Sequence, residues 1–209
     1  MQAQVVQMLR ISAKDEKMVE EFHRIHAEAK KLGFARIFRS PTLFEDIVKS
    51  ILLCNCTWGR SLEMAEALCD LRQHCGKKGS KRKRRSGDGP KAVDDDRWQM
   101  SRNFPTPKEI ACLDEETLNR HCNLGYRASI VLDVARNIEN GNLNLEDFES
   151  AMSDASWIRQ RLLKIKGFGP FTVANIMMCL GFYQYIPVTV KHLDGKLHFL
   201  SHKWTRFQS

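Results

Sequence analysis

A glycine-rich turn separates two stretches of helical pattern within residues 162–175 and limits how the chain can fold there. Apolar residues recur at helical spacing before and after the turn, and residues 166–170, Lys-Gly-Phe-Gly-Pro, interrupt them. Gly167 and Gly169 permit backbone angles that a Cβ would forbid, and they let the backbone approach another surface closely. The helix that follows would present unpaired N–H groups and a positive dipole end, which suits a phosphate. A plain tight turn between packed helices would give the same pattern.

The rest of the chain also follows helical spacing, so the sequence predicts an all-α fold. The N-terminal part holds one expected strand and then helices. The expected elements, in order, are a short strand at Val5–Ile11, a helix at 15–32 ended by Gly33, a central helix from a Ser40-Pro41 cap to Leu52, a helix at 61–73, short helices from a capping box at Thr106–Glu109 to Cys122, a helix at 128–138, one capped by Asp154, and one from Phe171 to about Gly181.

Composition bounds the class of protein. The 209 residues are 43% hydrophobic, enough for a core, and we expect no membrane partner because no apolar run approaches the length of a span. The seven cysteines are odd in number and form no Cys-x-x-Cys pair, so we expect reduced core residues rather than a zinc or iron–sulfur site.

The formal net charge of +8 is concentrated in one segment, because seven basic residues lie between Lys77 and Arg85. Residues 76–97 are rich in charged and small residues and poor in apolar ones, so we expect a disordered basic loop. The run Lys81–Arg85 fits a nuclear import signal that would bind an import receptor, or a DNA tether. A solvated linker without function would look the same.

Four segments, in chain order, resemble the helix-hairpin-helix DNA glycosylase superfamily. Asn55 with Arg60 five residues later, and Leu124-Gly125-Tyr126-Arg127-Ala128, are similar to segments of 8-oxoguanine glycosylases. Phe104-Pro105-Thr106-Pro107 resembles a segment of bacterial 3-methyladenine glycosylases, and the glycine turn resembles the superfamily hairpin. The resemblance covers about residues 16–188, and it does not indicate which base is removed.

The resemblance implies a function in base-excision repair. Such enzymes flip a damaged base out of double-stranded DNA before releasing it. Tyr126 would be the aromatic wedge, and Arg127, Arg60 and Asn55 would contact the orphaned base or phosphates. The hairpin residues Lys166, Gly167, Phe168 and Gly169 would contact the DNA backbone. The carbonyls of Leu163, Ile165 and Phe168 would hold a monovalent cation, and no other cofactor is implied. We expect a monomer that acts in the nucleus.

Two positions depart from the superfamily pattern. Bifunctional members carry a lysine nucleophile at the position of Phe171, so this chain resembles monofunctional members. The superfamily also uses an aspartate after a Pro-Val-like pair, and here Pro187-Val188 is followed by Thr189. A neutral hydroxyl cannot stabilise the sugar cation formed as the base leaves. Asp194 is a weak substitute because it lies five residues later.

The domain organisation expected from these observations has three parts. Residues 1–14 would be a remnant of a β region or a linker, 15–188 the helical domain, and 189–209 an atypical tail. The tail lacks a clear apolar period, so we expect a C-terminally incomplete fold, from a shortened or alternatively processed product. Two further readings remain open beside a glycosylase of doubtful activity: a non-catalytic module that binds duplexes or lesions, and an unrelated helical interaction protein.

Overall fold

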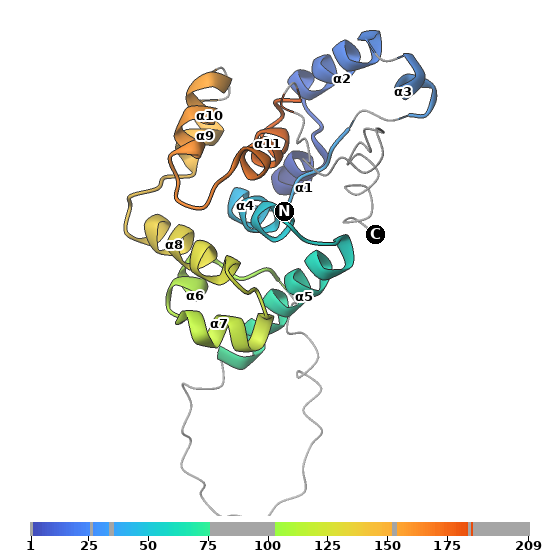
Figure 1. The fold of residues 1–209 in the computed structure, drawn as a ribbon. Helices are drawn as coiled ribbons and strands as arrows, with labels where there is room; N and C mark the ends of the chain where they lie inside the picture. The colour runs from blue at the N-terminus through green and yellow to red at the C-terminus, as the bar shows by residue number, and fades with distance from the viewer. Residues whose placement is uncertain are drawn as a thin grey trace, which may run out of the picture.

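The structure, a computed structural model, describes residues 2–25, 27–33, 36–75, 103–151, 154–183 and 185. The described residues form helices and no strands, so the predicted all-α class is confirmed. Figure 1 shows the helices in chain order. Their bounds are α1 Gln2–Leu9, α2 Ala13–Ile25, α3 Ala27–Lys31, α4 Leu43–Leu52, α5 Trp58–Cys75, α6 Pro107–Ala111, α7 Glu115–Cys122, α8 Arg127–Glu139, α9 Glu146–Ser150, α10 Ala155–Leu163 and α11 Pro170–Cys179.

Helix α4 lies at the centre of the fold, as its apolar composition predicted. It contacts α5, α8 and α11, and these helices surround it in Figure 1. Its apolar side chains are buried on nearly every face: Leu43, Phe44, Ile47, Val48, Ile51 and Leu52. Burying one such side chain contributes roughly 1.5–3 kcal/mol, so α4 is a main source of the stability of the fold.

The start of α4 differs from the prediction. We expected Ser40 to cap the helix and Pro41 to occupy its first turn, but the helix begins two residues later. Thr42 is the N-cap, and its hydroxyl accepts a hydrogen bond from the Glu45 amide at 3.2 Å. Thr42 with Glu45 is an equally good cap pattern, and Ser40 is used otherwise, because its amide donates to the buried carboxylate of Asp46 at 2.8 Å.

Local signals predicted several other helix ends correctly. Thr106 and Glu109 form the expected capping box at the start of α6, with Pro107 in the first turn. Asp154 caps α10 by accepting from the Trp157 amide at 2.9 Å. Gly33 follows α3 with a φ of +66°, the left-handed conformation that ends helices. Helix α9 was not predicted, and the single helix expected over 15–32 is divided between α2 and α3.

The strand expected at Val5–Ile11 is wrong, because α1 covers most of that segment. Val5, Val6 and Leu9 are substantially exposed, whereas Arg10, which an amphipathic strand would not bury, is 4% exposed. The side chain buried here is therefore that of Arg10. The short apolar run does not indicate which side of this segment faces the core.

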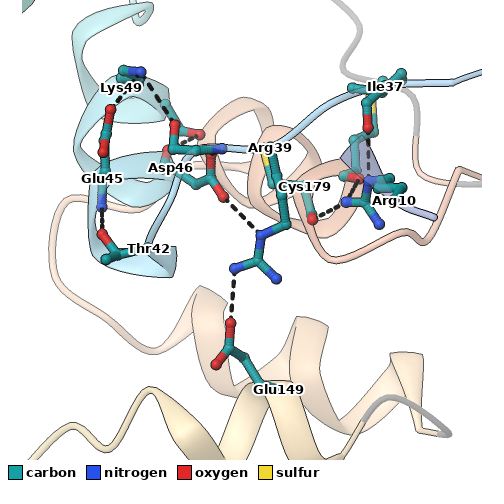
Figure 2. Close-up of polar contacts among 12 residues, drawn as sticks. Arg10, Ile37, Arg39, Thr42, Glu45, Asp46, Lys49, Glu149 and Cys179 are labelled. Atoms are coloured by element: carbon teal, nitrogen blue, oxygen red, sulfur yellow. Dashed lines mark hydrogen bonds and ion pairs between the residues drawn. The ribbon is translucent and has the colours of Figure 1, made fainter. Parts of the chain in front are cut away.

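Two buried arginines attach the N-terminal segment to the helical core (Figure 2). Arg10 donates to the carbonyls of Ile37, Met178 and Cys179, and the last two belong to the C-terminal end of α11. A cation at this end satisfies carbonyls that lack a partner inside the helix. Arg39 donates to Glu149 Oε1 at 2.7 Å and forms an ion pair with Asp46 at 3.4 Å.

Burial raises the pKa of the Asp46 carboxyl above its ordinary value, although Ser40 and Arg39 act in the opposite direction. Within the described residues, no helix is long and apolar enough to cross a bilayer. The residues of the expected basic loop and of the expected tail, 76–97 and 189–209, lie outside the described residues, as does the run Lys81–Arg85.

Candidate nucleic-acid interface

The glycine hairpin joins α10 to α11 and packs against α8. It closes with a hydrogen bond from the Phe168 amide to the Ile165 carbonyl at 3.1 Å. Gly167 has a φ of +87°, and a Cβ built on it would lie 2.8 Å from the side chain of Ile130 in α8. Both the backbone angle and the contact require glycine here. This position therefore fixes the hairpin against α8.

Gly169 differs from Gly167, although the sequence suggests the same role for both. Its φ of −86° is open to any residue, and a Cβ there would meet nothing within 4 Å. Nothing within the described chain requires glycine at this position. Gly169 is the exposed N-cap residue of α11, and it provides no side-chain cap for the helix. Pro170 has no amide hydrogen, so the first-turn amides of α11 that remain for an external acceptor are those of Phe171 and Thr172.

The other two hairpin residues expected to contact DNA point in different directions. Lys166 has a side chain that is 92% exposed and lies 3.8 Å from the carboxylate of Asp133. Phe168 is 6% exposed and belongs to the hydrophobic core. The phenyl ring thus anchors the hairpin, and only the backbone at this residue is available for a ligand.

Tyr126 is one of the most exposed large apolar side chains among the described residues, at 53%. It follows Gly125, whose φ of +61° turns the chain into α8, and it occupies the N-cap position of that helix. Its hydroxyl lies 3.5 Å from the Cys54 carbonyl and 3.5 Å from Asn55 Nδ2. These distances are long for hydrogen bonds, so the hydroxyl is only weakly held, and about half of the residue is accessible to a ligand.

Arg127 supports Tyr126 from the interior. Its guanidinium carbon lies 4.6 Å from the centre of the Tyr126 ring, and the residue is 8% exposed. The guanidinium donates to the carbonyls of Cys54 and Leu124. The sequence suggested a donor that reads a base. In this structure both terminal nitrogens of the guanidinium donate to backbone carbonyls, so base reading by Arg127 stays a prediction.

Asn55 lies in the loop between α4 and α5, and Arg60 lies in the first turn of α5, just after that loop. Asn55 is exposed and has a φ of +48°, a left-handed conformation that asparagine adopts more readily than most residues. Arg60 donates to the carbonyl of Asn123, the left-handed C-cap of α7, and to Glu63 at 3.3 Å. The structure thus brings Asn55, Arg60, Tyr126 and Arg127 together around one loop.

Two residues at this loop were missed by sequence reasoning. Cys54 lies immediately before Asn55, and its Sγ is 2.9 Å from the hydroxyl of Thr172 in the first turn of α11. Thr172 is 1% exposed, and Cys54 is half-buried. Burial raises the pKa of the Cys54 thiol, against weaker opposing effects of Thr172 and Arg127. No local sequence signal pairs two residues 118 positions apart.

The residues expected to take part in chemistry are only partly placed. Phe171, at the position where the sequence resemblance implies a lysine in bifunctional enzymes, is half-buried, and its carbonyl accepts from Asn175 Nδ2 at 2.8 Å. A phenyl ring has no amine for covalent chemistry. Thr189 and Asp194 lie outside the described residues. The described residues therefore include Phe171 but not the other two positions expected to bear on the chemistry.

Sequence comparison gives one relevant relative. No family model matches this sequence. Over 75 residues the chain is 36% identical to YfjP of Bacillus subtilis (strain 168), which carries the name of a DNA-3-methyladenine glycosylase. The match covers 36% of this chain and 25% of the relative, so it extends over about a quarter of that protein.

Comparison of the fold gives consistent neighbours. The structure of MBOgg1 in complex with a low-affinity DNA ligand matches with a TM-score of 0.63, at 22% identity, over 89% of this chain and 58% of that one. The Clostridium acetobutylicum 8-oxoguanine glycosylase/lyase, in complex with double-stranded DNA containing cytosine opposite 8-oxoG, matches with a TM-score of 0.62 at 22% identity, over the same shares. Its apo form matches with a TM-score of 0.55 at 18% identity, over 100% and 71%.

The structural comparisons concern the fold, and the sequence comparison concerns 75 residues of the chain. The fold neighbours share the arrangement of helices, and the bacterial relative adds a match in sequence. The chain spans 58% of the length of the two DNA-bound neighbours. The chain therefore shares its helical fold with these 8-oxoguanine glycosylase structures, and over 75 residues it is similar in sequence to the Bacillus subtilis relative; both findings agree with the resemblance noted in its sequence.

Proposed function

We propose that this chain binds double-stranded DNA and extrudes a damaged base, as a DNA N-glycosylase of base-excision repair. The observation that carries the proposal is the exposed ring of Tyr126, supported by Arg127 and joined through one loop to the hairpin helix. A base cannot react inside the duplex, so such an enzyme needs a wedge and a fixed grip on the backbone. Both elements are adjacent to α8 here.

The hairpin supplies the grip. The first-turn amides of α11 and the positive end of its dipole attract a phosphate, and the open space at Gly169 allows close approach. Lys166 adds a solvated positive charge beside them. These contacts to the DNA backbone do not depend on the base sequence of the DNA. They position the duplex without identifying a base.

The wedge supplies the distortion. An aromatic side chain that stacks on bases contributes about 1–3 kcal/mol per base, enough to offset part of the cost of unstacking. Asn55 has both a donor and an acceptor for the edge of the base left without a partner. Arg60 has a forked donor group at the same loop.

Base release itself depends on the residues at positions 171 and 189, which are Phe171 and Thr189. With Phe171 at the lysine position, the chain would act without strand cleavage, as a monofunctional enzyme. The name of the Bacillus subtilis relative favours a simple glycosylase, whereas a fold neighbour is named as a glycosylase/lyase. Thr189 lacks the charge that would stabilise a sugar cation, so release by this chain would depend on Asp194 or another group.

Thr189 also favours a second function, recognition of duplexes or lesions without cleavage of the glycosidic bond. The two functions share the hairpin, the wedge and the arginines and differ at the carboxylate. A panel of duplexes, each with a different damaged base, separates them when both binding and base loss are measured. Base loss with the unmodified chain supports the enzyme. Binding without loss, with loss gained in Thr189→Asp, supports the recognition module.

The hairpin also suits a monovalent cation. Carbonyls in the last turn of a helix have no hydrogen-bond partner within that helix. The carbonyl of Leu163, at the end of α10, is one of these. The Ile165 carbonyl accepts one hydrogen bond, and a carbonyl oxygen has a second lone pair. With the Phe168 carbonyl these groups would hold the ion, which would supply positive charge near a bound phosphate. Replacing potassium with a large organic cation at constant ionic strength should weaken duplex binding.

Nuclear localisation and a monomeric state belong to the same proposal. The run Lys81–Arg85 would bind an import receptor. A reporter fusion that stays in the cytoplasm with this run intact would contradict nuclear import. Light scattering at several concentrations tests the expected monomer.

A further inference from the structure

We propose that Cys54 is a positioning residue that couples the DNA-gripping hairpin helix to the wedge. This inference rests on the proposed function and deepens it. Cys54 is the residue at which the two halves of the interface meet: its thiol contacts Thr172 of α11, and its carbonyl accepts a hydrogen bond from Arg127. The same residue therefore contacts the helix that would hold the phosphate and the side chain that supports the wedge.

The contacts of the thiol define its role. Sγ lies 2.9 Å from Thr172 Oγ1 and 3.5 Å from the Ser50 carbonyl, in the last turns of α4. The thiol hydrogen has the Ser50 carbonyl as an acceptor, so the Thr172 hydroxyl can donate to the sulfur. Both interactions need a side chain that donates and accepts at once.

The thiol keeps its hydrogen at neutral pH, because burial raises the pKa of Cys54 above that of a free cysteine. A raised pKa lowers the fraction of thiolate, so this cysteine is suited to hydrogen bonding rather than to nucleophilic chemistry. Serine carries the same donor and acceptor capacity, whereas alanine carries none.

The carbonyl contacts extend the connection to the wedge. Arg127 donates to the Cys54 carbonyl while its guanidinium lies against the Tyr126 ring. Asn55, the next residue, lies 3.5 Å from the Tyr126 hydroxyl. A shift of the Cys54 backbone therefore moves the ring, its support and a proposed base contact together. Movement of α11 on binding a phosphate would reach all three through Thr172.

The test uses a duplex that contains a tetrahydrofuran abasic-site analogue with 2-aminopurine opposite it. The fluorescence of 2-aminopurine rises when it is unstacked, so it reports the wedge, and affinity for an undamaged duplex reports the grip. The variants are Cys54→Ala, Cys54→Ser, Thr172→Val, Thr172→Ser and the double variant Cys54→Ala/Thr172→Val. Cys56→Ala, at a half-buried cysteine in the same loop, is the matched control.

We expect Cys54→Ala and Thr172→Val each to lower the fluorescence rise and to reduce the preference for the abasic duplex about fivefold, the effect of one lost hydrogen bond. Cys54→Ala should retain its affinity for the undamaged duplex, because Cys54 makes no proposed contact with DNA. The serine variants should behave like the wild type, and the double variant should be no worse than either single variant, because both remove one contact.

Three results would overturn the coupling. They are unchanged fluorescence in both single variants, additive losses in the double variant, and Cys54→Ser behaving like Cys54→Ala. In each case a wild-type protein that binds DNA and raises the fluorescence leaves the proposed function intact. A wild-type protein that binds neither duplex would overturn the proposed function and the coupling together.

Discussion

The guanidinium of Arg127 lies 4.6 Å from the centre of the Tyr126 ring and donates to the Cys54 carbonyl behind it. The two neighbours in sequence thus have opposite environments, since Tyr126 is 53% exposed and Arg127 is 8% exposed. One side chain is available to a ligand, and the other holds it in place. This division separates the effects of substitutions on binding from their effects on stability.

Tyr126→Ala should weaken binding and leave the fold intact. The ring is largely exposed, so we expect the free energy of unfolding to change by less than about 1 kcal/mol. Loss of one stacking contact should lower affinity for the abasic duplex about tenfold. Chemical denaturation and fluorescence anisotropy measure the two quantities. Full affinity in Tyr126→Ala would contradict the role of the ring, and Tyr126→Phe is the control that should retain binding.

Arg127→Ala should instead destabilise the protein. The substitution removes donors from two backbone carbonyls in a buried region, and hydrogen bonds from charged groups contribute about 1.5–3 kcal/mol. We expect a loss of that size in the free energy of unfolding. Arg127→Lys should recover only part of it, because an ammonium lacks the planar fork. Stability within about 0.5 kcal/mol of the wild type would show that Arg127 does not support the loop.

The two hairpin glycines should respond differently to alanine. Gly167→Ala forces a positive φ on alanine and brings its Cβ against Ile130, so it should cost about 2 kcal/mol or more of stability. Gly169→Ala fits the open space and the ordinary φ, and it should preserve stability. A Cβ there would stand between the backbone and a phosphate, so affinity for DNA should fall about tenfold, the effect of a lost charge-assisted hydrogen bond. Normal DNA affinity in Gly169→Ala would argue against phosphate binding at this turn.

Asp46 should make stability fall as pH rises. Burial raises its pKa in the folded state above the ordinary value of 3.8, so the folded protein binds the proton more tightly than the unfolded chain does. The stabilisation is fully present below 3.8 and is lost as pH rises through the folded-state pKa. Stability of the wild type relative to Asp46→Asn should therefore decrease over that interval. A relative stability that increases there would contradict the raised pKa.

Asp114 supplies a control of opposite sign. Its carboxylate accepts hydrogen bonds from the amide and the hydroxyl of Thr117 at the start of α7. These two hydrogen bonds lower the pKa of Asp114 below the ordinary value of 3.8. The stabilisation is present above that value and is lost as pH falls through the folded-state pKa. Asp114→Asn keeps an oxygen for the cap and removes the charge. The free energy of unfolding of the wild type, relative to that of this variant, should therefore increase as pH rises through the folded-state pKa.

Thr106→Ala tests the fold away from the interface. The threonine and Glu109 form a reciprocal capping box, and losing such a cap costs about 1 kcal/mol. We expect this loss in denaturation and no change in affinity for either duplex. A large change in DNA affinity would extend the interface to α6.

Signals that act within a few residues were readable in the sequence. The capping box at Thr106, the cap at Asp154 and the left-handed residue at Gly33 depend on neighbours along the chain. Val5–Ile11 failed because a short apolar run does not distinguish helix from strand, and because tertiary contacts bury Arg10 instead.

In the candidate site, too, tertiary contacts could not be predicted from the sequence. Tyr126 and Asn55 could be predicted as exposed partners because the resemblance names both segments. The burial of Arg127 could not, since an arginine in a sequence looks the same whether its donors meet solvent or carbonyls. The contact between Cys54 and Thr172 depends on how α4 and α11 pack, and no pattern along the chain encodes it. The different reasons for Gly167 and Gly169 also required the position of Ile130.

Amide hydrogen exchange, measured with and without a duplex containing an abasic-site analogue, reports the grip and the wedge in one experiment. We expect exchange to slow at the first-turn amides of α11 and at the loop of Asn55 and Tyr126, with no slowing at α6. Protection confined to other surfaces, or protection of the hairpin without the Tyr126 loop, would contradict a single interface built from the grip and the wedge.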